Sequence, residues 1–271
     1  MAQNAIRETV VENLQEIRVK HQEKLRNIND VLIFVVITLF ILAFLGFLVM
    51  PEIRIDALNS IYIEMAIFLF TVISGFTVSR QNNRYRQIMS EITAFDGSVS
   101  TMYREFAHFG KEYQDEFKTI ALDHYEPVIK EHKWDYNIIN KSNTLTKTYD
   151  LVWRALADDR IAHIEYSAVS EVKKQLSDMQ KNRKDMIALH AERIPQFQWF
   201  VIAFLALMLI LTISSVSSYG DVVESLLKAS FVTAIIATVV MLRRLDTLDL
   251  FESFLGEHSA QDVIDIFDGK K

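Results

Sequence analysis

The chain has 271 residues, half of them hydrophobic, and a formal net charge of -6. This mild acidic balance argues against a nucleic-acid partner, because binding phosphates requires clustered basic surface. The absence of cysteine excludes disulfides, thiolate metal ligands and a cysteine nucleophile. Three prolines and seven glycines are too few for a turn-rich all-β chain.

The first 30 residues are mixed in charge and carry apolar side chains at roughly helical spacing. These side chains are Ile6, Val10, Leu14, Ile17, Leu25 and Ile28. The pattern predicts a cytoplasmic amphipathic helix over residues 1–30 that leads into a membrane.

Four apolar stretches are long enough to cross a bilayer. Residues 31–50 carry no charge, and a helix of this length spans about 30 Å. Residues 59–79 hold one charge, that of Glu64, and residues 194–220 hold none. A fourth stretch, residues 229–242, is long enough if the helix begins near Val222. We therefore expect an all-α membrane protein with two transmembrane hairpins, residues 31–80 and 194–244.

Basic residues flank all four stretches on one side of the expected membrane. They include Arg80, Arg84, Arg86, Lys181, Arg183, Lys184, Arg193, Arg243 and Arg244. The two connecting loops, around residues 51–58 and 217–225, are acidic instead and carry Glu52, Asp56, Asp221 and Glu224. The positive-inside rule then places both termini and the central region in the cytoplasm.

The central region, residues 81–193, is predicted to be a cytoplasmic helical domain. An apolar stripe from Ile88 to Ile120 follows the second span with no breaker between them. It predicts one long helix, or two helices with a bend near Gly97 or Gly110. Pro127 is expected near a helix start or a kink.

Four further features complete the chain. Residues 135–143 are the best loop candidate, and residues 158–160 are expected to break the helical stretch that follows. Pro195 suits the first turn of the third span. The acidic tail, residues 245–271, carries spaced apolar side chains and is expected to pack on the cytoplasmic bundle.

A polar stripe distinguishes the second span from a helix that faces only lipid. Steps of four and three place a carboxylate, hydroxyls and smaller side chains on one helical face: Ser60, Glu64, Ile67, Thr71, Ser74 and Val78. Such a face suits a water-filled space or a polar bundle interior. We expect these residues to line a pore.

Each of these residues also has an alternative role. Glu64 sits about one turn from the outer end and could reach interfacial water instead of a pore. Thr71, Ser74, Gly75 and Thr77 could equally allow close helix packing. An apolar gate at Ile67, Phe68 and Val78 competes with ordinary lipid contact.

The acidic residues of the outer loops predict a negative pore mouth. Glu52, Asp56, Asp221 and Glu224, repeated around a symmetric oligomer, would favour cations. This expectation requires that the side chains face the symmetry axis.

No constellation of residues predicts catalysis, a metal or a cofactor. His124-x-Glu126 and Glu131-His132 lack a known metal-ligand spacing. The acidic residues Asp262, Asp265 and Asp268 lack the spacing and glycine of a calcium-binding loop. No nucleotide-binding loop or nucleophile motif occurs, so an enzyme is the least favoured class.

Several short pieces resemble the bestrophin-like family of bacterial membrane proteins. They are Glu91-x-x-Ala94, Met102-Tyr103-Arg104, Tyr125 with Val128-Ile129, Trp134, and Arg193-Ile194-Pro195 with Trp199. The resemblance covers about half of the chain. The segment after the fourth span departs from it, because Asp249-Leu250-Phe251 and Gly256 match loosely and a proline is missing.

The resemblance implies a homo-oligomer, a pentamer in bestrophin channels, in a bacterial inner membrane, with the second span lining the pore. The apolar constriction of true bestrophins has no counterpart, since no isoleucine–proline–phenylalanine run occurs. We expect an ion channel with some cation preference, whose partners are its own copies, lipid and permeant ions. The alternative is a membrane-anchored helical scaffold or stress sensor without conductance.

Overall fold

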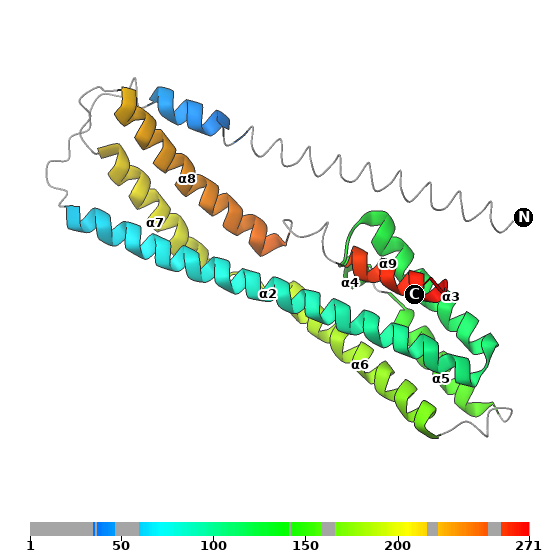
Figure 1. Cartoon of the computed structure of the whole chain (residues 1–271). Coiled ribbons are helices and arrows are strands. Elements are labelled where there is room, and N and C mark those ends of the chain that lie inside the picture. Colours follow the sequence, from blue (N-terminus) through cyan, green and yellow to red (C-terminus); the bar gives the residue numbers. More distant parts are fainter. Residues whose placement is uncertain are drawn as a thin grey trace, which may run out of the picture. The chain divides into compact units, whose positions relative to one another are not determined.

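The computed structural model describes residues 35, 37–46, 60–140, 142–158, 166–215, 222–248 and 256–270. All secondary-structure elements in these ranges are helices (Figure 1). The expected N-terminal helix, residues 1–30, lies outside them. The first expected span, residues 31–50, is described only in part, as a short apolar helix, Ile37–Gly46.

The chain divides into two compact units. One, here the span unit, comprises residues 1–83 and 193–250; the other, the bundle unit, comprises residues 84–192 and 251–271. Helix α2, Ser60–Phe109, contributes its first part to the span unit and its second part to the bundle unit.

The span unit contains the first part of α2 together with α7, Gln196–Ser215, and α8, Val222–Thr247. Helices α7 and α8 pack side by side (Figure 1). Buried apolar side chains from all three helices form one core: Phe70, Ile202, Leu205, Ala206, Leu209, Ile235 and Leu242. The expected hairpin 194–244 thus has a packed interior, and its second helix runs three residues further, to Thr247.

Asp246 near the end of α8 holds the start of α7. Its carboxylate Oδ1 accepts a 2.7 Å hydrogen bond from the backbone N–H of Ile194, and its carbonyl accepts one from the Arg193 guanidinium. A carboxylate suits this position because the first N–H groups of a helix lack intrahelical partners. Pro195 directly precedes the helix, one residue earlier than expected.

The bundle unit contains the second part of α2 and five further helices. These are α3 (Lys111–Glu131), α4 (Tyr136–Ile139), α5 (Thr144–Ala157), α6 (Tyr166–Ala191) and α9 (Glu257–Phe267). The apolar stripe of α2 is buried as its spacing indicates, from Ile88 through Val99 to Phe109. Phe106 packs on Phe117 of α3 with ring centroids 5.0 Å apart.

Helix boundaries confirm the expected break at Gly110 and depart from expectation at Pro127 and in the loop 135–143. Of the two expected arrangements of the stripe, the structure has two helices that meet at Gly110, because α2 ends at Phe109 and Gly110 has a φ of 116°, which favours glycine. Gly97 lies inside α2, which continues past it. Pro127 lies inside α3, near its end. The expected loop 135–143 contains the short helix α4.

The acidic tail packs on the bundle as expected, through α9. Ala260, Val263 and Phe267 are the buried residues of α9. Lys118 of α3 donates to the carbonyl of Phe267 at 2.9 Å and to Asp268 at 3.2 Å. At the other end of α9, Glu257 pairs with His132, which follows α3. Polar contacts therefore attach both ends of α9 to the α3 segment.

Candidate functional site

Three of the described helices are long and apolar enough to cross a membrane. Their apolar segments lie in α2, α7 and α8, the helices that form the core of the span unit. The first expected span, residues 31–50, coincides with the partly described Ile37–Gly46 segment and is not established by it.

One side of the membrane part of α2 faces α7 and α8. Phe70, Ser74, Thr77 and Gln81 are buried and follow one another at steps of four, three and four. The Thr77 hydroxyl donates to the carbonyl of Ile73 and accepts a 2.7 Å hydrogen bond from Gln198 of α7. This face of α2 is therefore used for packing within the chain.

An adjacent side of α2 is not covered by any other segment among the described residues. Glu64, Thr71 and Gly75 are exposed on it, and Ile67 is 48% exposed. Nothing lies within 4 Å of where a Cβ on Gly75 would be. An exposed carboxylate and hydroxyl in a span are costly against lipid, so this side needs water or another polar surface. We call Glu64, Ile67, Thr71 and Gly75 the open face of α2.

The structure separates the six predicted pore-lining residues into groups. Glu64, Ile67 and Thr71 lie on the open face, whereas Ser74 is only 6% exposed and Val78 packs against the core. Ser60 begins α2, but its side chain lies outside the described residues. Among the small residues with two possible roles, Ser74 and Thr77 serve intrachain packing, while Thr71 and Gly75 remain open.

Of the residues predicted to form the acidic outer mouth, only Glu224 lies in the described ranges. Its carboxylate forms a 3.1 Å ion pair with Lys228, one turn further along α8. The charge of Glu224 is therefore balanced within the chain. Glu52, Asp56 and Asp221 lie outside the described residues.

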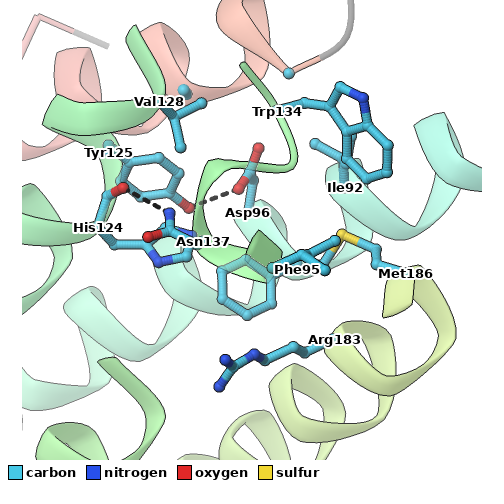
Figure 2. Close-up of a pocket in the computed structure, with 13 residues that line it drawn as sticks. Ile92, Phe95, Asp96, His124, Tyr125, Val128, Trp134, Asn137, Arg183 and Met186 are labelled. Atoms are coloured by element: carbon cyan, nitrogen blue, oxygen red, sulfur yellow. Dashed lines mark hydrogen bonds between the residues drawn. The ribbon is translucent and has the colours of Figure 1, made fainter. Parts of the chain in front are cut away.

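The bundle unit holds a pocket that the sequence analysis did not identify (Figure 2). Its volume is about 50 Å³. Its walls come from α2, α3, α4, α6, α9 and the segment after α3, and most of them are apolar, including Ile92, Phe95, Val128, Trp134 and Met186. Asp96, His124, Tyr125, Asn137 and Arg183 add polar groups.

Asp96 of α2 is the buried acid of this pocket, with an exposed fraction of 5%. Its Oδ1 accepts a 2.6 Å hydrogen bond from the Tyr125 hydroxyl, and its Oδ2 has no partner in hydrogen-bond geometry within the described ranges. Burial raises the pKa of Asp96 from 3.8 to about 6, and the hydroxyls of Ser259 and Tyr125 partly offset this effect.

His124 of α3 lies beside the same pocket between two aromatic rings. Its ring is 5.3 Å from that of Phe95 and 5.1 Å from that of Tyr125. Burial, and then the positive charge of Arg183, lower the pKa of His124 to about 4. The imidazole is therefore neutral near pH 7.

The sequence does contain a signal for Asp96. The acid lies four residues after Ile92 and three before Val99, on the buried stripe of α2. An acid at such a position predicts a buried carboxylate, but not the pocket, whose walls come from distant segments. No group of three or more potential metal-ligating side chains occurs among the residues that the structure describes.

Together, the helices and their exposed apolar surfaces define a multi-pass helical membrane protein. The sequence profile of the Bestrophin-like domain matches residues 31–263. The chain therefore belongs to the bestrophin-like family, as its short motifs suggested. No curated protein and no solved structure matches it.

Proposed function

We propose that the protein is a homo-oligomeric ion channel whose pore is lined by the open face of α2. The observation that carries the proposal is the exposure of Glu64 and Thr71 on a helix suited to a bilayer, on a side that α7 and α8 do not cover. Assembly of several copies around an axis would enclose these groups in water. Membership of the bestrophin-like family supports a channel-like role.

Cation preference follows from Glu64 in this proposal. A ring of carboxylates, one from each copy, attracts cations and repels anions. Because Lys228 balances Glu224, Glu64 carries more of the expected selectivity than Glu224 does.

Planar-bilayer recording of the purified protein tests the proposal. We expect single-channel currents, and a reversal potential in a potassium chloride gradient that Glu64→Gln moves toward the chloride value. Thr71→Val should change unitary conductance. The matched control, Thr238→Val on α8, should leave conductance unchanged, because that hydroxyl bonds to the carbonyl of Ala234 within its own helix.

Different outcomes of this experiment would reject either the channel itself or only the role of Glu64. Currents with unchanged selectivity in Glu64→Gln would reject the role of Glu64 only. No current at any voltage or pH tested, together with an apolar plug along the axis of the assembled particle, would reject the channel and favour the membrane-anchored scaffold.

A further inference from the structure

We propose that the pocket of the bundle unit binds a small primary amine, with the ammonium group held by the Asp96 carboxylate. This inference does not depend on ion conduction. It concerns a site in the bundle unit, and a binding measurement can test it without any current.

The surroundings of the Asp96 carboxyl group favour a bound cation. Its carboxyl group is buried and lines the pocket; Oδ1 accepts a hydrogen bond from the neutral Tyr125 hydroxyl, and the neutral Ser259 hydroxyl also acts on the carboxyl group. In Figure 2 the second oxygen is directed away from Tyr125. Both of these partners are neutral hydroxyls, and a buried charge without an opposite charge is costly, so a ligand ammonium group would balance the ionised carboxylate.

The side chains of the pocket walls also favour a bound cation. Phe95, Tyr125 and Trp134 surround the acid with aromatic surface, and rings attract cations through their electron-rich faces. Neutral His124 adds no opposing charge. Arg183 also lines the pocket, and its charge acts on His124, whereas Asp96 is governed by burial and by two hydroxyls. An acid among aromatic rings therefore favours an ammonium group.

The volume of the pocket limits the size of the ligand. A pocket of about 50 Å³ accommodates roughly three or four water-sized groups. A ligand of three or four non-hydrogen atoms fits this space, with its ammonium at Asp96 and a short alkyl chain against Ile92 and Met186. For a ligand this small we expect a dissociation constant on the order of 1 mM.

Trp134 provides the measurement, because it lines the pocket and is 7% exposed. The full-length protein in detergent at pH 7.5 is titrated with n-propylamine hydrochloride while tryptophan fluorescence is recorded. 1-Propanol is the matched neutral probe, and sodium chloride controls for ionic strength. We expect a saturable change with the amine, at least tenfold weaker binding of the alcohol, and no effect of the salt.

Single substitutions test which residues bind the amine. Asp96→Asn keeps the shape and removes the charge, so it should weaken amine binding at least tenfold. Asp115→Asn, an exposed acid of α3, should leave binding unchanged. The signal should vanish in Trp134→Phe and persist in Trp199→Phe.

A measurement on the unsubstituted protein covers the case in which Asp96→Asn fails to fold. Protonation of Asp96 removes its attraction for a cation, so amine binding should be about tenfold weaker at pH 5 than at pH 7.5. The proposal is overturned if no saturable change occurs up to the solubility limit of the amine. Equal binding of amine and alcohol, or a signal that survives in Trp134→Phe, would also overturn it.

Discussion

The Tyr125 hydroxyl of α3 donates a 2.6 Å hydrogen bond to the Asp96 carboxylate of α2, and both side chains are buried. The bond joins two helices at the wall of the pocket. The carboxylate in turn contributes, after burial, to raising the pKa of Tyr125 well above its ordinary value of 10.0. The phenol therefore remains a donor throughout the physiological pH range.

Asp96→Asn should stabilise the protein at neutral pH. The pKa of Asp96 is 3.8 when unperturbed and about 6 in the folded chain, so the folded state binds a proton more tightly. The contribution of Asp96 to stability is therefore greatest below pH 4, falls as pH rises toward 6 and stays lowered above that; the full difference corresponds to roughly 3 kcal/mol. The amide variant lacks this loss, and its thermal unfolding midpoint should exceed that of the unsubstituted protein at pH 7.5 but not at pH 4.

Asp115→Asn is the control for this comparison, because Asp115 is an exposed acid on α3. Its unfolding midpoint should follow that of the unsubstituted protein across the whole pH range. An Asp96→Asn midpoint that falls below the unsubstituted value at pH 7.5 would show that the ionised carboxylate stabilises the fold.

His124→Gln should act in the opposite pH direction. The pKa of His124 falls from 6.5 to about 4 on folding, so the unfolded chain gains a proton first as the pH falls. Stability is then lost between about pH 6.5 and 4, by up to roughly 3 kcal/mol. We expect the glutamine variant to lose less stability on acidification, in thermal unfolding followed by circular dichroism. The exposed His108→Gln should retain the unsubstituted profile.

The apolar periodicity of α2 predicted its buried side well, because Ile88 through Phe109 pack on other helices of the same unit. It could not predict where α2 ends. Phe117 and Ile120 of α3 are also buried, so the spacing continues across a change of chain direction. Only Gly110, with its positive φ, marks the turn.

The candidate sites were less accessible to sequence reasoning. The polar stripe includes Glu64 and Thr71, which are exposed, but it also includes Ser74, which packs within the chain. A hydroxyl at helical spacing fits a water-facing side and a close helix contact equally well. The pocket requires Ile92, Trp134 and Gly256 to meet, and their separation along the chain hides this contact from any local pattern.

Arg84→Lys should destabilise the bundle unit. Arg84 is 2% exposed, and its guanidinium donates to the carbonyls of Leu189 at 2.8 Å and His190 at 3.1 Å, near the end of α6. These carbonyls lie where a helix has unpaired acceptors, and a cation there is favourable. Lysine lacks the planar fork that reaches both acceptors. We expect a loss of roughly 1.5–3 kcal/mol in unfolding free energy.

Arg86→Lys controls for the change of side chain, because Arg86 is exposed two residues further along α2. Its effect should stay within about 0.5 kcal/mol. Equal losses in the two variants would mean that the buried contacts of Arg84 add nothing to stability.

Replacing glycine by alanine should have opposite effects at two positions of the bundle unit. Gly256 precedes α9 with a φ of 82°, so alanine there should cost about 1 kcal/mol. The added Cβ would meet Trp134 at 3.4 Å, an ordinary contact, so the backbone conformation sets the cost. Gly97 lies inside α2 with nothing within 4 Å of the added carbon, and alanine there should stabilise by about 0.5–1 kcal/mol. Thermal unfolding midpoints that move in the same direction for both variants would contradict this assignment of strain.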